Sequence, residues 1–165
     1  MENKKTKKTG TILIVVLASL LFLFVGIRTY FIDWYTVSGG SMLPTYTEGQ
    51  IVFAHKVGNA DRFDVVIIEG ETLVGQDLII KRIVAFEGEE VWTEKGVLFV
   101  CSNGVTTSYA NEEYGKGQVG LVPKEIKRQT VPQGHVFVLG DNRQDSIDSR
   151  TFGAVPVDMI EAIVF

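Results

Sequence analysis

The chain has 165 residues, 45% of them hydrophobic, so it can build one folded domain and little more once its N-terminal apolar stretch is set aside. Its net charge of −4 is unevenly placed: five basic residues and one acidic residue give residues 1–30 a charge of +4, which leaves −8 for the remainder. A domain this acidic argues against nucleic acid as a partner.

The N-terminal apolar stretch predicts a membrane anchor. Residues 11–27 carry no charge, and Arg28 interrupts the run before Tyr30 and Phe31. At about 1.5 Å per residue this run is roughly 25 Å long, slightly short of a ~30 Å hydrocarbon core. Lysines before it and an acidic domain after it predict a cytoplasmic N-terminus. The expected parts are a cytoplasmic basic tail (1–10), a transmembrane anchor (11–31) and an extracytoplasmic catalytic domain (32–165).

A cleaved secretory signal is the alternative interpretation, because it shares the basic start and the apolar core. The apolar run is long for that role, however. Arg28, Tyr30 and Trp34 follow it, where a cleavage site needs small residues. The anchor is therefore the favoured interpretation.

Short apolar runs separated by turn residues make up the rest of the chain, and they predict a mainly β domain with an antiparallel sheet. Between two of the runs, Glu94-Lys95-Gly96 is expected to form a hairpin turn. Residues 102–134 gather small and charged side chains and are expected to be an irregular excursion from the sheet. The predicted strands are 35–37, 51–55, 64–68, 78–85, 90–92, 97–100, 135–139 and 162–165.

A serine in a glycine-rich bend, Gly40-Ser41-Met42-Leu43-Pro44, follows the anchor. Gly39 and Gly40 leave room for a substrate backbone to approach, so they are candidates for a substrate cleft. Backbone N–H groups in such a bend could hold the oxyanion of an acyl transfer. Read alone, the segment is better explained as a simple turn that enters the first strand.

A serine hydroxyl becomes a nucleophile only when a neighbouring base takes its proton. His55 and His135 stand far apart in apolar runs and are interpreted as structural. The lone Cys101 allows no internal disulfide, and no Cys/His cluster has zinc-ligand spacing. We therefore expect no metal and no cofactor, and we look for a different base.

Lys81 is the candidate base. A lysine can take a proton only when it is neutral, and burial among apolar side chains favours the neutral form. Strand alternation places Ile79 and Ile83 on the same face as Lys81. Arg82 stays protonated and cannot act as a base. Taken alone, the two residues are better explained as an ordinary Lys-Arg pair at a sheet edge.

A polar loop follows the strand at 135–139. It runs Gly-Asp-Asn-Arg-Gln-Asp-Ser-Ile-Asp-Ser-Arg over residues 140–150. Short polar side chains and two arginines predict a loop braced by charge-assisted hydrogen bonds, such as one between Asp148 and Arg150. By itself the segment is a polar surface turn.

Taken together and in this order, four segments resemble the sequence boxes of bacterial type I signal peptidases. The resemblance spans residues from about 4 to 155. It implies that family's β fold, a location in the bacterial cell membrane, and removal of signal peptides from secretory preproteins after small residues at positions −1 and −3. The four segments are 38–45, 62–66, 81–84 and 140–150.

The resemblance also implies roles for individual residues. Ser41 matches the nucleophile, Lys81 the general base, and Ser146 the hydroxyl that orients this lysine. Together they imply a Ser/Lys dyad that works through an acyl-enzyme.

The remaining matches are supporting residues. Asp148 and Arg150 match an ion pair near the site, and Asp141 matches a structural acid of the same loop. Met42 matches a residue beside the serine at the substrate cleft.

This chain departs from the family pattern at three places. Gly39 stands where some members have a hydroxyl residue that helps to bind the oxyanion, which leaves backbone donors such as the Ser41 N–H. Residues 85–89, Ala-Phe-Glu-Gly-Glu, replace the common Gly-x-Pro-Gly-Asp. Residues 62–64, Arg-Phe-Asp, replace the usual Arg-Gly-Asp.

The expected partners are secretory preproteins and the lipid bilayer, while contact with the secretion machinery is left open. Two alternatives remain at this point. One is an inactive, membrane-tethered paralogue that keeps the fold and binds peptides. The other is a self-cleaving Ser/Lys protease like the repressor-type peptidases, although these lack an N-terminal anchor.

Overall fold

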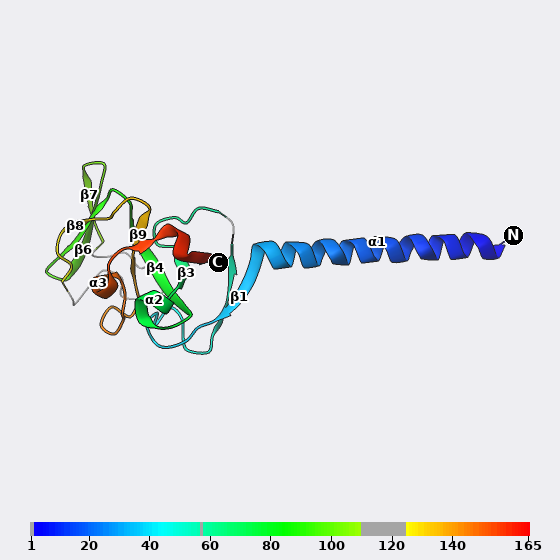
Figure 1. Ribbon diagram of the computed structural model, residues 1–165, viewed down its shortest axis with the longest axis horizontal. Coiled ribbons are helices and arrows are strands. Elements are labelled where there is room, and N and C mark those ends of the chain that lie inside the picture. Colours follow the sequence, from blue (N-terminus) through cyan, green and yellow to red (C-terminus); the bar gives the residue numbers. More distant parts are fainter. Residues whose placement is uncertain (1, 57, 110–124) are drawn as a thin grey trace.

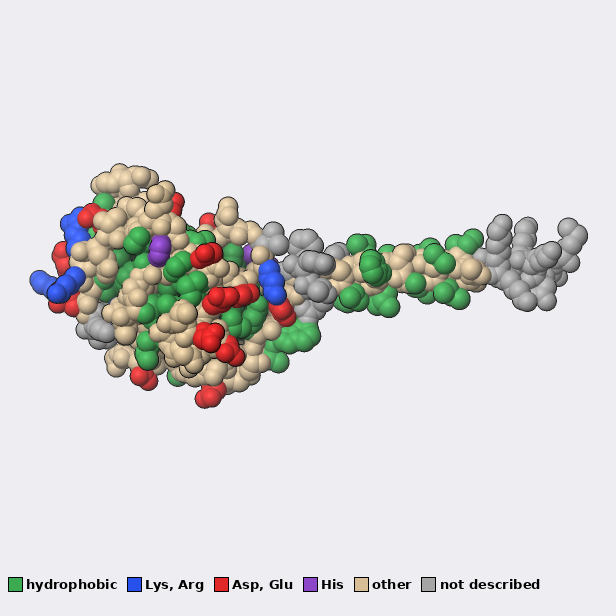
Figure 2. Space-filling view, in the orientation of Figure 1, with side chains coloured by type: hydrophobic (Ala, Val, Ile, Leu, Met, Phe, Trp, Pro, Cys, Tyr) green, Lys and Arg blue, Asp and Glu red, His purple; other side chains and the backbone are tan. Residues whose placement is uncertain are grey.

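The computed structural model describes residues 2–56, 58–109 and 125–165. A long N-terminal helix, α1 (Glu2–Phe31), stands away from a β domain (Figure 1). Its segment Thr9–Gly26 has a mean hydropathy of 2.5, and none of it is buried against the domain. Figure 2 shows hydrophobic side chains around this part of the helix, whereas acidic side chains gather on the domain. By length and composition α1 could cross a membrane.

The domain contains two antiparallel sheets, so the predicted fold class is confirmed. The larger sheet has seven strands in the order β1-β2-β11-β3-β4-β9-β10, and the smaller has four in the order β7-β6-β5-β8. The strands of the larger sheet are β1 (Ile32–Thr36), β2 (Ile51–His55), β3 (Val65–Glu69), β4 (Leu78–Phe86), β9 (His135–Leu139), β10 (Val155–Pro156) and β11 (Ile160–Val164). Those of the smaller sheet are β5 (Glu90–Glu94), β6 (Val97–Ser102), β7 (Val105–Ser108) and β8 (Gln129–Thr130).

All eight predicted runs overlap a strand. The run at 51–55 matches β2 in full, whereas β1 begins at Ile32, three residues before the predicted start, because Ile32 already pairs with His55. The predicted hairpin turn is present between β5 and β6. Lys95 and Gly96 both have positive φ, 51° and 81°, as a two-residue hairpin loop requires.

The expectation of an irregular excursion at 102–134 is wrong for part of that range. Asn103 and Gly104 take positive φ values of 51° and 78° and turn the chain from β6 into β7. β7 is exposed throughout, so it lacks the alternation that marks a half-buried strand. Further along, β8 pairs with β5. Residues 110–124 lie outside the described residues.

Three short helices complete the described elements: α2 (Glu71–Val74), α3 (Ser149–Phe152) and the 3₁₀ helix η1 (Val157–Met159). α3 starts at the end of the polar loop, where the side chain of Asp148 accepts the backbone N–H of Arg150 as a helix N-cap.

β4 is a long interior strand of the larger sheet. It lies between β3 and β9, and its side chains enter all three buried apolar clusters. Ile80 packs in one cluster, Ile83 in the second, and Val84 in the third, which joins the two sheets. The interpretation of the Lys-Arg pair as part of a sheet edge is therefore wrong. Both residues are buried, with Lys81 3% and Arg82 6% exposed.

Candidate active site

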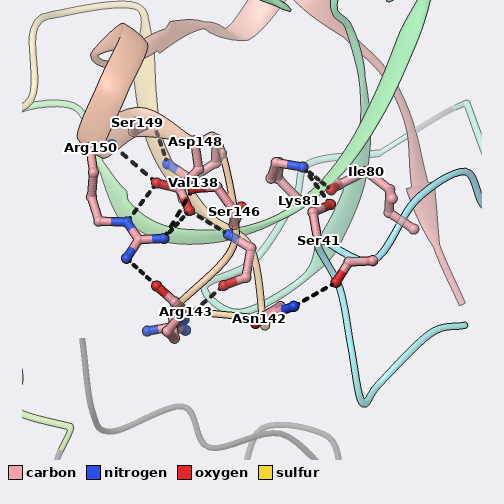
Figure 3. Close-up of polar contacts among 12 residues, drawn as sticks. Ser41, Ile80, Lys81, Val138, Asn142, Arg143, Ser146, Asp148, Ser149 and Arg150 are labelled. Atoms are coloured by element: carbon pink, nitrogen blue, oxygen red, sulfur yellow. Dashed lines mark hydrogen bonds and ion pairs between the residues drawn. The ribbon is translucent and has the colours of Figure 1, made fainter. Parts of the chain in front are cut away.

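Ser41 and Lys81 meet in the structure. The Nζ of Lys81 donates a hydrogen bond of 2.8 Å to the Oγ of Ser41, and a second one of 2.9 Å to the carbonyl oxygen of Ile80. Ser41 lies in the turn that follows β1, while Lys81 comes from the middle of β4 (Figure 3). Residues 40 positions apart thus form a nucleophile–base pair within hydrogen-bond reach.

Burial favours the neutral form of Lys81, which is the form that can act as a base. Removal of the ammonium from water lowers the pKa of Lys81 to about 8, although the charges of Asp148 and Asp141 act to raise it. With such a pKa roughly a tenth of the side chains are neutral at pH 7, against about one in a few thousand for an exposed lysine. An appreciable fraction of molecules can therefore accept the Ser41 proton.

The turn around Ser41 is held by the polar loop 140–150. The backbone N–H of Asn142 donates to the Ser41 carbonyl at 3.0 Å, and its side-chain Nδ2 donates to the Gly40 carbonyl at 3.0 Å. The Ser41 N–H makes no hydrogen bond within the described residues. It therefore remains available as a donor to a bound group.

A cavity of about 240 Å³ opens beside Ser41 and Lys81. Apolar side chains of β2, β3, β4 and the segment after β1 make up most of its lining, among them Val37, Val52, Ile67 and Ile80. This mainly apolar lining suits apolar side chains of a bound chain.

The three cleft candidates differ in position. Gly39 and Gly40 are exposed at the turn, but neither lines the cavity. Met42 does not line it either and is fully buried, in the cluster that contains Val52 and Ile80. Its apolar side chain packs in the same cluster as Val37 and Ile67, which line the cavity, and its place beside the substrate cleft stays a prediction.

Ser146 lies close to the site, but its expected bond to Lys81 is not formed. The Ser146 Oγ is buried and has no hydrogen-bond partner among the described residues. A side chain at Gly140 would place its Cβ 2.1 Å from this Oγ and 2.5 Å from the Ser41 carbonyl oxygen. Glycine is thus required where the two segments converge.

The expected ion pair between Asp148 and Arg150 is present and almost fully buried. Arg150 donates from Nη2 and Nε to the carboxylate at 2.7 and 2.8 Å, and the N–H of Gly140 adds a bond of 3.0 Å. Burial alone raises the pKa of Asp148, but these hydrogen bonds outweigh it and hold the pKa below its ordinary value. The carboxylate remains charged beneath the site.

Asp141 is held by Arg82 and Thr45, to which the sequence analysis gave no structural role. Arg82 donates from Nε and Nη2 to its two carboxylate oxygens at 2.8 and 2.6 Å. The hydroxyl of Thr45 donates to the same carboxylate. This planar pairing joins β4, the nucleophile turn and the polar loop. Arg82 was considered only as a base, so its structural role was missed.

The two histidines lie away from this site. His55 and His135 both line a second cavity, of about 560 Å³, and the ring of His55 packs 5.2 Å from that of Phe165. Among the described residues, no three His, Cys, Asp or Glu side chains come together in a group that could hold a metal ion.

The chain is also similar to known proteins. Residues 9–165 match the family model described as signal peptidase, peptidase S26. The chain is 34% identical to signal peptidase I T of Bacillus subtilis (strain 168), over 96% of this chain and 86% of that protein. It is also 34% identical to thylakoidal processing peptidase 1 of Arabidopsis thaliana, over 76% of this chain and 38% of that protein. The crystal structure of a signal peptidase I from Enterococcus faecalis V583 aligns with a TM-score of 0.52 and 27% identity, over 66% of this chain and 99% of that chain.

Proposed function

The chain belongs to the signal peptidase family, peptidase S26, and is a signal-peptide-removing serine endopeptidase; from this premise we propose that Ser41 is its nucleophile and Lys81 its general base. The observation that carries the proposal is the 2.8 Å contact between the Ser41 hydroxyl and a buried lysine with a pKa of about 8. The alternatives of an inactive paralogue and a self-cleaving protease have no comparable support.

In this mechanism, neutral Lys81 takes the Ser41 proton as Oγ attacks the carbonyl carbon after position −1. The oxyanion that forms accepts a hydrogen bond from the Ser41 N–H. Lys81 then gives its proton to the leaving amine, and the mature protein departs from an ester-linked acyl-enzyme. A water molecule deprotonated by Lys81 hydrolyses the ester, which releases the signal peptide and restores the serine.

The substrate is a preprotein segment that lies extended along the sheet, with small side chains entering the cavity. Val37, Ile67 and Ile80 line that cavity, so an apolar side chain such as that of alanine suits it. Asp141, Asp148 and the ion-paired Arg150 support the loop that holds the nucleophile turn, and Ser146 orients Lys81 when a substrate is bound.

We also propose that α1 anchors the enzyme with its basic tail (1–10) in the cytoplasm, its span at 11–31 and its catalytic domain (32–165) outside. β1 follows α1 directly, and it exposes Trp34 opposite Phe53 of β2. Aromatic side chains favour the membrane–water boundary, so these two residues suit contact with the lipid surface. Contact with the secretion machinery remains a prediction.

The orientation can be tested in sealed inverted membrane vesicles, whose lumen corresponds to the outside of the cell. Added protease should remove only the N-terminal tail and leave the domain intact until detergent opens the vesicles. Digestion of the domain in sealed vesicles would show that the orientation is the opposite of the one proposed.

The activity is tested with the full chain in detergent and a preprotein peptide whose signal ends in Ala-x-Ala. We expect cleavage after the second alanine. The same peptide with tryptophan at −1 should be cleaved at least about a hundredfold more slowly, because a site that takes a small side chain at −1 would have to displace its wall to admit the indole ring. Equal cleavage of both peptides, or none of either by folded protein, would contradict the proposal.

A further inference from the structure

The turn at residues 61–64 contains a strained residue that the proposed mechanism does not use. Phe63 has a φ of 74°, a left-handed conformation that bulky L-residues rarely adopt. Glycine takes this conformation freely, so phenylalanine needs surroundings that hold it there. Strain of this kind persists only where neighbouring contacts over-determine the backbone, and it concentrates at functional sites.

One set of contacts connects this turn to the smaller sheet. The Phe63 ring meets that of Tyr109 edge-on, with centroids 5.0 Å apart and planes at 72°. Tyr109 is buried, directly follows β7, and donates its N–H to the Leu98 carbonyl of β6 at 2.9 Å. Beside Phe63, Arg62 forms a 2.5 Å ion pair with Glu89. Two adjacent side chains thus hold the turn against residues that directly flank strands of the smaller sheet, Glu89 before β5 and Tyr109 after β7.

The backbone of the same residue connects to the larger sheet. The Phe63 N–H donates to the Ile83 carbonyl at 2.9 Å, and the Phe63 carbonyl accepts Nη1 of Arg82 at 2.7 Å. The other side of the Arg82 guanidinium holds Asp141 through Nε and Nη2. Because the guanidinium is planar and rigid, the position of the Phe63 carbonyl helps to fix the angle at which Arg82 meets Asp141.

Asp141 is followed directly by Asn142, which makes the two 3.0 Å hydrogen bonds to Gly40 and Ser41 described above. A continuous series of contacts therefore leads from the smaller sheet to the nucleophile. We infer that Phe63 is a positioning residue: its ring, held against Tyr109, fixes the carbonyl that orients Arg82, and thereby the loop that holds the Ser41 turn. The inference rests on the proposed role of Ser41.

Steady-state kinetics of the full chain in detergent test this inference. Phe63→Gly permits the same φ but removes the ring, so kcat should fall about tenfold while KM stays within about twofold, since a misplaced nucleophile affects the transition state more than binding. Phe63→Tyr keeps the ring and should retain the parent kcat. Tyr109→Leu should lower kcat similarly, and the double variant should lose no more than either single one.

Phe99→Leu is the matched control, because Phe99 stacks on Trp92 in the smaller sheet, at 5.6 Å, and is not part of the apolar cluster against which Phe63 packs. It should leave kcat unchanged. An equal loss in Phe99→Leu, an unchanged kcat in Phe63→Gly, or additive losses in the double variant would overturn the inference.

Amide hydrogen exchange gives a second measurement that does not depend on cleavage. In Phe63→Gly, exchange at the Asn142 N–H should accelerate at least tenfold, while the Val138 N–H, bonded to the Ser149 hydroxyl at 2.9 Å, should keep its protection. Unchanged protection of Asn142, or equal acceleration at both amides, would contradict the positioning role. If the parent cleaves no peptide, the proposed function fails while this measurement still decides the inference.

Discussion

Replacement of Lys81 by methionine is expected to lower kcat roughly 10⁴-fold. Methionine fills the buried site with a side chain of similar length, but it cannot accept the Ser41 proton. Ser41→Ala should cause a loss of at least the same size, because it removes the attacking oxygen itself. The measurement is single-turnover cleavage of the Ala-x-Ala peptide by folded variants.

The two substitutions should also be strongly non-additive, because the pair acts as one unit across its 2.8 Å contact. The double variant should be no slower than Ser41→Ala. The exposed Lys56, which pairs with Asp33 at 3.3 Å, offers a matched control, and Lys56→Met should keep the parent kcat. A Lys81→Met enzyme that retained a tenth of the activity would show that another group is the base.

The same dyad predicts how activity depends on pH. Because protonated Lys81 cannot act as a base, kcat/KM should rise with pH and level off above the Lys81 pKa of about 8. Below that value, each decrease of one pH unit should lower kcat/KM about tenfold. A profile that is flat between pH 6 and 9, or that falls as pH rises, would contradict the assignment.

The β architecture was predictable because strands that are buried on both faces leave short, continuous apolar runs in the sequence. β3 shows this directly, since Val65, Val66, Ile67 and Ile68 are all buried. β7 was missed for the opposite reason, because none of its side chains is buried. The Asn103-Gly104 pair was the available signal, as this dipeptide favours a tight hairpin.

The candidate site was predictable only in part. A resemblance between motifs identified Ser41 and Lys81, whereas their separate segments favoured a turn and a sheet edge. What the sequence could not reveal was which partners the folded chain provides. Arg82 pairs with Asp141 across 59 positions, a contact created by the pairing of β4 with β9. The burial of Met42 likewise depends on strands distant in sequence.

Replacement of Asp148 by alanine is expected to cause a large loss of stability. The substitution leaves the guanidinium of Arg150, whose side chain is 2% exposed, buried without its counter-charge. It also removes the acceptor for the Gly140 N–H and the N-cap of α3. Loss of one partner of a buried pair costs about 3–5 kcal/mol, so the free energy of unfolding, measured with denaturant, should fall by about that amount.

Two variants separate this effect from a general loss of packing. Asp33→Asn breaks the exposed pair with Lys56 and should change stability little. Asp148→Asn combined with Arg150→Met removes both charges and should recover much of the loss, because no charge is then left buried alone. The Asp148 charge also acts to raise the pKa of Lys81. In the fraction of Asp148→Ala that folds, the rise of kcat/KM with pH should therefore occur at lower pH than in the parent. A shift of this rise to higher pH would show that Asp148 does not act on Lys81 through its charge.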